Sequence, residues 1–523
     1  FSSATGLVFI STSTGQIDVS ASKSGTYIVT NTLDGSVCSG LSATATVTIA
    51  GQVWNGSVNS SWDNHANWSC GFVPYPVTDV LIPDVAVDPV IATGLTGEAG
   101  NLEIDPGGSL TISGGTMRVY GSASGSGSFD AASGTVEFLG DAPQSVISGL
   151  FTGNAVMNLT INNPAGVTLT APLGVSGVVL VQNGTLVSDG NLTLLSDASG
   201  TALVDGSGNG SIAGDVTMQR YLPSAYGYKY FSSPFSDATV SEFGDDMNLA
   251  SSFPLFYRYD ENRTSSGWVG YTTGTNILAV MSGYAANFGS SGVAKTVDVT
   301  GEVNNGSLSV TLYNHNKAFT KGFNLVGNPY PSPIDWDAAT GWTRSNVDYA
   351  VYYFRASTTD EYGGTYSSYV NGIPSDPGVS TNIIPSMQGF FVHVTDTFPA
   401  TATLGMTNSV RISDRTHPFL KSSAASARFL LRVTAAFTDD TSSVDPLVVY
   451  FDDAAKTSFD SGFDALKLMN TDMMVTNFYS VLPGGQKLSI NALPGQADTA
   501  MYVPLGLKSY RDGEVTFRMS DIE

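Results

Sequence analysis

The sequence has few charged side chains, and cations are the scarcest among them. Charged residues make up 13% of the 523 residues, against roughly 25% in an average soluble protein. Residues 71–227 contain no lysine and only two arginines, Arg118 and Arg220. Because phosphate groups are bound by clustered lysine and arginine, this composition and the net charge of −23 argue against nucleic acid and anionic membrane surfaces as partners.

Long apolar runs and cysteines are also scarce. No apolar run approaches the roughly 20 residues of a membrane-spanning helix, so we expect no membrane span. The two cysteines, Cys38 and Cys70, are too few for a disulfide scaffold. They could pair with each other, remain as two buried thiols, or have a partner upstream of residue 1. Because the Cα separation decides the pairing, the sequence leaves these alternatives open.

The common catalytic motifs are absent. The four histidines, His65, His315, His393 and His417, include no His-x-His or His-x-x-x-His pair that would suit a catalytic zinc. No Gly-x-Ser-x-Gly segment stands between a strand and a helix. Most acidic residues of 99–220 stand at turns beside glycine, although two on one face could form a glycosidase dyad. We predict that the chain is not an enzyme and holds no cofactor other than a candidate calcium ion.

Short strand-like runs fill the cation-poor region instead. Each run places apolar side chains at alternate positions, and Gly, Asn, Asp or Ser separates the runs. They are residues 101–104, 109–112, 116–119, 135–138, 158–161, 167–169, 178–181, 185–187 and 191–194. A period of two predicts strands, and strands this short must stack to bury enough surface. We therefore predict a parallel β-helix-like solenoid over residues 99–220, with a β-sandwich as the alternative.

Two smaller segments precede the predicted solenoid. Residues 1–50 contain alternating segments at 25–32 and 43–49, which are typical of the end of an immunoglobulin-like β-sandwich. Residues 51–98 contain three tryptophans, Trp54, Trp62 and Trp68, which need either burial or a ligand. Because the open end of a solenoid must be covered, we predict a Trp-rich cap or linker here.

The composition changes at Tyr221, where tyrosine and phenylalanine become frequent. We predict an aromatic-rich β-sandwich over residues 221–408 and a second, truncated β-sandwich over residues 409–523, with a short helix at 463–469. The fold class is therefore all-β. The chain lacks an initiator methionine and begins and ends in strand-like patterns, so we expect it to be a piece of a longer polypeptide.

Two groups of residues are candidates for binding. Trp268, Trp336 and Trp342 lie in or near turns, where they could stack on sugar rings or simply pack in a sandwich core. A run of aspartates could supply oxygen ligands to Ca²⁺, although a solvated acidic loop is the alternative because the order Asp-x-Asp-x-Asp-Gly is missing. These aspartates are Asp452, Asp453, Asp460 and Asp464.

The segment 322–336, Gly-Phe-Asn-Leu-Val-Gly-Asn-Pro-Tyr-Pro-Ser-Pro-Ile-Asp-Trp, is the most distinctive in the chain. It predicts a strand that runs into a turn made rigid by prolines. This segment and the glycine-rich strand at 387–392 resemble segments of large modular secreted surface proteins of the Bacteroidota, the type IX secretion cargo. Residues 54–74 and 25–30 resemble further pieces of the same proteins.

The resemblance implies export by the type IX secretion machinery and a place on the outer cell surface or in the medium. Many such proteins are adhesins or structural components. We therefore expect an extracellular structural or adhesive segment, a rigid β-rich stalk or fibre component whose partners are other surface proteins or glycans. The alternative is a carbohydrate-binding accessory region of a secreted polysaccharide-degrading enzyme. The identity of the ligand stays open.

Overall fold

The computed structural model describes residues 1–33, 40–271, 273–396, 400–413, 429–495 and 501–522. Within these ranges half of the chain is strand, and the only helical segments are short 3₁₀ turns, so the predicted all-β class is confirmed. None of these turns has the length or hydropathy of a membrane-spanning helix. The chain divides into two compact units, Phe1–Leu195 with Ser207–Thr217, and Ser196–Gly206 with Met218–Glu523.

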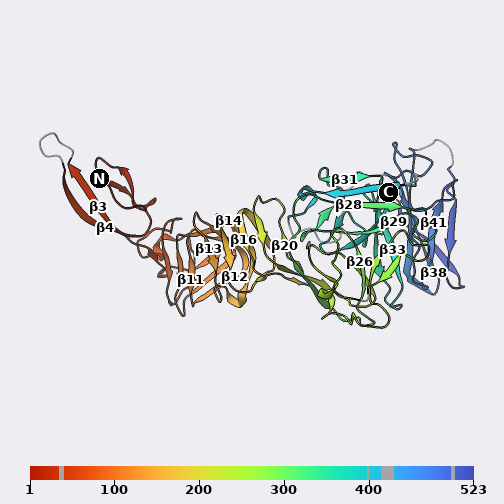
Figure 1. Ribbon diagram of the computed structural model, residues 1–523, viewed down its shortest axis with the longest axis horizontal. Helices are drawn as coiled ribbons and strands as arrows, with labels where there is room; N and C mark the ends of the chain where they lie inside the picture. Colours follow the sequence, from red (N-terminus) through yellow and green to blue (C-terminus); the bar gives the residue numbers. More distant parts are fainter. Residues whose placement is uncertain (34–39, 272, 397–399, 414–428, 496–500, 523) are drawn as a thin grey trace. The chain divides into compact units, whose positions relative to one another are not determined.

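The first unit begins with two antiparallel hairpins (Figure 1). Strand β1 (Val8–Ser11) pairs with β2 (Gln16–Asp18), and β3 (Gly25–Leu33) pairs with β4 (Leu41–Ile49). The small core between them is formed by Leu7, Tyr27 and Val29. The two strands predicted for the immunoglobulin-like end therefore exist and pair with each other.

A parallel β-solenoid of about seven turns follows. Its longest ladder is formed by β10 (Ser109–Val119), β12 (Ser128–Leu139), β14 (Ala155–Leu169) and β16 (Val178–Val187), each parallel to the next (Figure 1). Ser109 stacks on Ser128 and Leu159 on Val179, so one turn takes about 20 residues. Because these ladders are parallel, the solenoid is confirmed and the β-sandwich alternative for this segment is wrong.

The solenoid core is a column of aliphatic side chains. Met117, Val136, Leu159 and Val179 occupy matching positions on four successive strands, and each has 0% of its surface exposed. The alternation predicted from the sequence points these side chains inward and leaves threonines such as Thr135 on the outer face. Burying each such side chain stabilises the fold by about 1.5–3 kcal/mol, before entropy is counted.

Side-chain amides complete the turns of the solenoid. Nδ2 of Asn163 donates hydrogen bonds to Oε1 of Gln144 and to the carbonyl oxygen of Ala142, each at 2.8 Å. Nε2 of Gln144 donates in turn to the carbonyl oxygen of Val119 at 3.0 Å. Both side chains are buried. The amides therefore pair carbonyl groups that water does not reach.

The solenoid begins earlier than predicted. Strands β5 (Gln52–Val53), β6 (Val80–Ile82), β9 (Leu102–Ile104) and β11 (Ala123–Gly125) form a second parallel ladder. Residues 51–98 therefore supply strands to the stack as well as covering it. The difference arises because the strands here have only two or three residues, too few to show a period of two.

The three tryptophans of this segment are buried against one another. The ring centroid of Trp68 lies 5.0 Å from that of Trp54 and 4.8 Å from that of Trp62, in edge-to-face arrangements. Nε1 of Trp54 donates to the carbonyl oxygen of Val87 at 2.7 Å, and Nε1 of Trp68 donates to that of Trp62 at 2.9 Å. Of the two predicted explanations, burial is the one that the structure supports.

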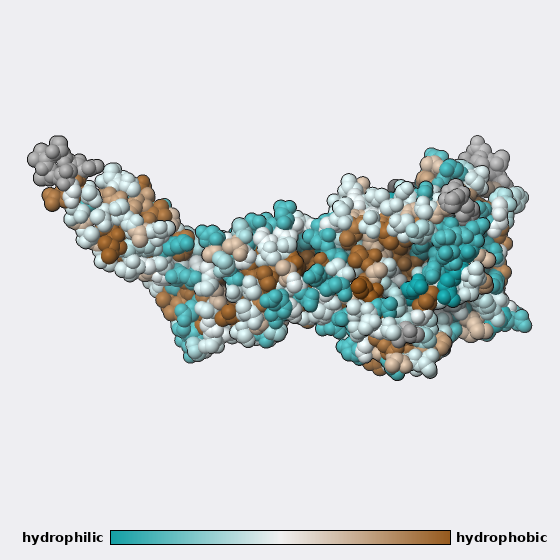
Figure 2. All heavy atoms as spheres, viewed as in Figure 1, coloured by the Kyte–Doolittle hydropathy of each residue, from teal (hydrophilic) through white to brown (hydrophobic). Residues whose placement is uncertain are grey.

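The outer face of the solenoid carries little charge. In the view of Figure 2 its surface is mostly pale, the colour of residues with intermediate hydropathy. Arg118 on β10 lies between carboxylates of the two adjacent strands, with Nε 2.8 Å from Glu137 and Nη1 3.9 Å from Glu98. This arginine, one of the two in residues 71–227, therefore ties neighbouring turns together.

The second unit contains several mainly antiparallel sheets. One comprises β23 (Tyr228–Phe231), β26 (Tyr284–Asn287), β24 (Phe256–Tyr259) and β25 (Trp268–Gly270). Another comprises β29 (Phe323–Gly327), β36 (Gly389–Val394), β32 (Val347–Ala356), β33 (Gly364–Val370) and β34 (Ile373–Pro374). A third comprises β28 (Leu308–Asn314), β37 (Ala400–Met406) and β31 (Trp342–Ser345).

The last sheet of the chain is built from its C-terminal part. Its strand order is β43 (Leu505–Lys508), β41 (Asn477–Val481), β42 (Lys487–Leu493), β39 (Asp440–Phe451), β38 (Leu430–Phe437) and β44 (Val515–Ile522). Tyr450 and Ile490 of this sheet share one hydrophobic core with Tyr230 and Phe391. The segments predicted as separate sandwiches at 221–408 and 409–523 therefore fold against a common core.

The prediction of a short helix at 463–469 is wrong. Strand β40 (Ala465–Leu466) lies there and pairs antiparallel with β42, with Ala465 opposite Ile490. Ala465 is fully buried. The local helix propensity of this segment is overridden because strand pairing buries Ala465 in the common core.

The distinctive segment at 322–336 has the structure predicted for it. Strand β29 pairs with β36 and then enters a turn organised by Asn328, which is fully buried. Nδ2 of Asn328 donates to the carbonyl oxygens of Ser332 and Pro385, each at 2.9 Å, and Oδ1 accepts the N–H of Tyr330. The turn places Trp336 in the wall of a cleft of the second unit.

Candidate functional site

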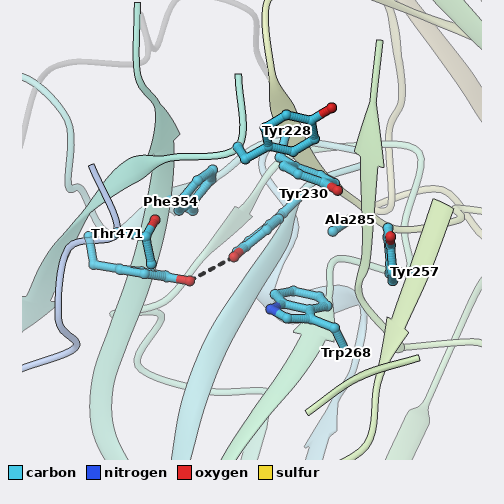
Figure 3. A pocket seen from close by; sticks show the side chains of 9 residues that line it. Tyr228, Tyr230, Tyr257, Trp268, Ala285, Phe354 and Thr471 are labelled. Atoms are coloured by element: carbon cyan, nitrogen blue, oxygen red, sulfur yellow. Dashed lines mark hydrogen bonds between the residues drawn. The ribbon is translucent and has the colours of Figure 1, made fainter. Parts of the chain in front are cut away.

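The second unit contains a cavity of about 380 Å³ whose wall is almost entirely aromatic (Figure 3). Seven of the nine described residues that line it carry aromatic rings. They are Tyr228, Tyr230, Tyr257, Trp268, Phe354, Tyr362 and Tyr366, and the other two are Ala285 and Thr471. We call this feature the aromatic cavity.

Strand alternation explains how the rings converge. Tyr228 and Tyr230 are two residues apart on β23, so they lie on the same face of its sheet. Trp268 on β25 lies opposite Tyr259 of β24 in the strand register, and its ring centroid is 5.5 Å from that of Tyr230. Phe354, which belongs to β32 in the adjacent sheet, stacks on Tyr230 with the two ring centroids 4.8 Å apart. Two sheets therefore contribute to the cavity.

The tyrosine hydroxyl groups of the cavity bind mainly to one another. The hydroxyls of Tyr230 and Tyr366 are 2.8 Å apart (dashed line in Figure 3). Burial raises the pKa of Tyr366 to about 12 and that of Tyr230 well above its usual value. Burial also raises the pKa of Tyr228, whose hydroxyl interacts with that of Tyr257. All of these phenols are therefore uncharged at neutral pH.

A second cleft, of about 800 Å³, is lined by Trp336, Trp342, Arg344 and Tyr349 together with turn residues that include Asn371. We call it the tryptophan–arginine cleft. The ring centroids of Trp336 and Trp342 are 4.7 Å apart. Trp336 is buried, whereas Tyr349 is 48% exposed. The cleft thus combines aromatic faces with a polar rim.

Arg344 is held among aromatic rings in this cleft. Its guanidinium carbon lies 4.0 Å from the ring centroid of Trp336 and 4.6 Å from that of Trp342. Burial lowers the pKa of Arg344 to about 10, which still leaves it charged at neutral pH. Its buried Nε has no hydrogen-bond partner in the described part of the chain. The cleft therefore contains a charged guanidinium whose Nε is shielded from solvent.

The structure separates the three predicted sugar-stacking tryptophans into two places. Trp336 and Trp342 lie together in the tryptophan–arginine cleft, whereas Trp268 lines the aromatic cavity. Sequence reasoning missed Phe354 and Tyr366 as wall residues. The signal available was the crowding of tyrosine in 221–235, but Phe354 and Tyr366, which contact Tyr230, lie more than 100 residues further along the chain.

The four calcium candidates do not assemble into a site. Oδ1 of Asp452 accepts the N–H of Ala454 at 3.0 Å, and Oδ1 of Asp460 accepts that of Gly462 at 3.1 Å. No group of three His, Cys, Asp or Glu side chains placed to hold a metal ion is found within the described ranges. The arrangement of these aspartates in the described ranges does not support a calcium site, and the solvated-loop alternative fits the exposed Asp453 but not Asp460 and Asp464, which are buried.

Like Asp460, Asp464 is buried. Its Oδ1 accepts the N–H of Ala492 and its Oδ2 accepts that of Asp460, both at 2.7 Å. Burial nevertheless raises the pKa of Asp464 to about 7, because desolvation of the charged carboxylate outweighs the two hydrogen bonds. This residue links β40 to β42 and has a structural role.

Two acidic residues of 99–220 accept backbone N–H groups close by in the chain. Oδ1 of Asp130 accepts the N–H of Ala132 at 3.0 Å, and Oδ1 of Asp197 accepts that of Ser199 at 2.7 Å. Aspartate favours such turns because its carboxylate accepts a backbone N–H two residues on. Asp197 stands, as predicted, at the turn between β18 (Ser196–Asp197) and β19 (Gly200–Thr201), whereas Asp130 lies within β12.

Two histidines have carboxylate partners that the sequence did not reveal. Nδ1 of His393 lies 2.5 Å from Oδ2 of Asp348, and both side chains are buried. Nδ1 of His315 lies 2.6 Å from Oε2 of Glu261. Burial raises the pKa of Asp348, while the hydrogen bond to His393 acts in the opposite direction. The first pair joins β36 to β32, and the second joins the segments that follow β28 and β24.

The cysteine pairing stays a prediction. Cys70 is exposed, and its Sγ lies 4.0 Å from the carbonyl oxygen of Gly51. Cys38 lies outside the described residues, as does His417. The exposed position of Cys70 does not match the alternative of two buried thiols.

Comparison with known proteins places the chain in a family. A family model described as a domain of unknown function, DUF8693, matches residues 53–133 and 130–523. The two matches cover the Trp-rich segment, the solenoid and the second unit, and leave out the N-terminal hairpins. No curated protein and no solved structure matches the chain. Because the family model covers well over half of the sequence, the chain belongs to the DUF8693 family.

Proposed function

We propose that this chain is a non-enzymatic segment of a secreted surface protein. The solenoid acts as a stiff element of a stalk or fibre, and the second unit carries the binding sites. The single observation that carries the proposal is the column of fully buried aliphatic side chains through the solenoid, as at Met117, Val136 and Leu159. Close-packed interiors of this kind resist deformation, which suits a passive load-bearing element.

The polar features of the solenoid agree with a structural role. Arg118 is engaged by Glu98 and Glu137, and Asp130 and Asp197 accept backbone N–H groups close by in the chain. These groups stabilise neighbouring turns instead of meeting around a cleft. The two aromatic-walled hollows of the second unit supply places where a partner can bind.

The proposed location rests on the resemblance to type IX secretion cargo. The two segments that carry it, 322–336 and 387–392, contribute the adjacent strands β29 and β36. We propose that the type IX secretion machinery exports the protein to the outer surface. Its partners there are other surface proteins or glycans.

The test uses the full chain, because residues 221–408 share their core with the C-terminal sheet. Antibodies against the chain should label intact, unpermeabilised cells of the source organism. The immobilised chain should capture surface proteins or glycans saturably and without turnover. Hydrolysis or lyase cleavage of a polysaccharide by the purified chain, abolished by Asp→Asn changes in the solenoid, would contradict the proposal.

A second candidate function is that of a carbohydrate-binding accessory region of a polysaccharide-degrading enzyme. The tryptophan–arginine cleft favours it, because Trp342 and Tyr349 offer faces for a sugar ring beside the charged guanidinium of Arg344. A glycan array should then show saturable binding by the full chain. Trp342→Ala should abolish it, whereas Trp342→Phe, which keeps an aromatic face, should weaken it only modestly. Unchanged binding by Trp342→Ala would remove this candidate.

A further inference from the structure

The wall of the aromatic cavity is unusual in presenting many ring faces and no charged group. Of its described lining residues, none is Lys, Arg, His, Asp or Glu. Aromatic faces carry a partial negative charge and attract organic cations placed within about 6 Å of the ring centre. A site built from several such faces is therefore suited to a cation that needs no directional hydrogen bonds.

Four of the five tyrosine hydroxyls of the described wall already interact with one another. The hydroxyls of Tyr230 and Tyr366 bind each other, and that of Tyr228 interacts with Tyr257. A sugar requires several directional partners for its hydroxyl groups, and most of the phenols here are not free to act as such. The cavity therefore differs in kind from the tryptophan–arginine cleft.

The cationic residues nearest in sequence are directed elsewhere. Lys229 alternates with Tyr228 and Tyr230 on β23, and its Nζ donates to the carbonyl oxygen of Tyr226. Arg258 lies 3.5 Å from Asp260. Neither Lys229 nor Arg258 is among the described residues that line the cavity, so neither places its positive charge against the ring faces of the wall.

The electrostatic surroundings also favour a cation. The chain carries a net charge of −23. Glu361 precedes the wall residue Tyr362, and its Oε1 accepts a hydrogen bond from Nδ2 of Asn287 at 3.2 Å. Asn287 is the strand partner of the wall residue Tyr228. A carboxylate therefore lies beside two residues of the wall.

The mouth of the cavity is partly open to solvent. Tyr362 is 56% exposed and packs edge-to-face against Phe253, which is 54% exposed. The volume of about 380 Å³ exceeds that of a single ammonium group and falls in the range of sites for small organic molecules, roughly 300–1,000 Å³. A ligand can thus place its cationic head among the rings and leave its remainder at the mouth.

We propose that the aromatic cavity binds a quaternary ammonium group. Trp268 and Tyr230 provide inner faces, and Tyr362 closes over the ligand at the mouth. Desolvation of such a cation is inexpensive because its charge is spread over methyl groups, and the rings replace the water with polarisable faces. This inference goes beyond the proposed adhesive role and does not depend on the glycan candidate.

The experiment compares two isosteric probes on the full chain. Choline and 3,3-dimethylbutan-1-ol have almost the same shape, but only choline is charged. Isothermal titration calorimetry should show saturable choline binding and at least fivefold weaker binding of the neutral probe. Equal affinity for the two probes would overturn the proposal. The absence of saturable choline binding would overturn it as well.

Matched variants locate the binding. Tyr362→Leu, at an exposed position, should weaken choline binding at least fivefold, whereas Tyr362→Phe should bind like the wild type. Trp268→Leu should have the same effect as Tyr362→Leu, and circular dichroism checks that it folds. Trp342→Leu changes the other cleft and should leave choline binding unchanged. Choline affinity that falls with Trp342→Leu but not with Tyr362→Leu or Trp268→Leu would also overturn the proposal.

A vesicle-binding experiment shows whether the ammonium group comes from a lipid headgroup or from a small soluble molecule. Co-sedimentation with phosphatidylcholine vesicles but not phosphatidylglycerol vesicles, lost in Tyr362→Leu, identifies a lipid headgroup. Binding of free choline without vesicle binding identifies a small soluble ligand. Either outcome supports the shared chemistry.

Discussion

Nζ of Lys467 lies 2.5 Å from Oδ1 and 2.7 Å from Oδ2 of Asp445, and both side chains are almost fully buried. Oδ2 of Asp445 also accepts the N–H of Phe478 at 2.6 Å. The pair joins β39 to the chain beyond β40 and to β41. Removing two charges from water is costly, and this bidentate contact with its additional hydrogen bond offsets that cost.

Replacing Lys467 by methionine should destabilise the second unit by about 3–5 kcal/mol, because it leaves the Asp445 carboxylate buried without a cation. The measurement is the unfolding midpoint in urea. The double variant Lys467→Met with Asp445→Leu should recover most of the loss, since it removes the stranded charge. A single variant with the wild-type midpoint would show that the pair contributes little.

The stability of the second unit should depend on pH through Asp464. Its folded pKa of about 7 is above the value of about 3.9 in an unfolded chain. Between these values the folded state keeps a proton that the unfolded state has lost. The contribution of this group to stability therefore falls as the pH rises from about 4 to about 7, by on the order of 3–4 kcal/mol.

The variant Asp464→Asn isolates this effect, because the amide does not titrate. Its free energy of unfolding should be offset from that of the wild type by an amount that changes between pH 4 and pH 7 and is constant above about pH 8. Urea unfolding at one-unit pH intervals measures the difference. An offset independent of pH would contradict the raised pKa.

The buried amide pair of the solenoid should be needed for its stability. Asn163→Ala removes the amide that donates to Oε1 of Gln144 and to the carbonyl oxygen of Ala142. These two oxygen atoms then lose this hydrogen bond inside the fold. The expected loss is about 1–3 kcal/mol, measured by chemical unfolding. Asn162→Ala, the adjacent residue in β14, is the matched control and should cost less.

The tryptophan cluster at the start of the solenoid should be structural. Trp68→Ala removes a ring that contacts both Trp54 and Trp62, and should cost about 3–5 kcal/mol in unfolding free energy. Trp68→Phe should cost less because it keeps an aromatic ring in the space. Binding of choline and of glycans by the folded variants should match the wild type. A loss of binding at full stability would show that the cluster holds a ligand.

The strands of the solenoid could be predicted because their signal is local. Alternating apolar positions at 116–119, 135–138 and 158–161 are sufficient to define which side chains point inward, and the buried column from Met117 to Leu159 follows from them. The first turns of the solenoid were not predicted, because strands such as Gln52–Val53 are too short to show a period of two. The helix expected at 463–469 failed because a pairing partner distant in sequence decided its structure.

The sequence by itself determined that the chain is built of stacked and paired strands with a cation-poor, hydroxyl-rich solenoid, because side-chain alternation and charge are properties of neighbouring residues. Only the tertiary structure decided which aromatic residues share a cavity. Tyr230 and Tyr366 are 136 residues apart, and their hydroxyls meet because the two sheets that carry them share one hydrophobic core. Such packing depends on the register of many strands at once, which no local pattern encodes.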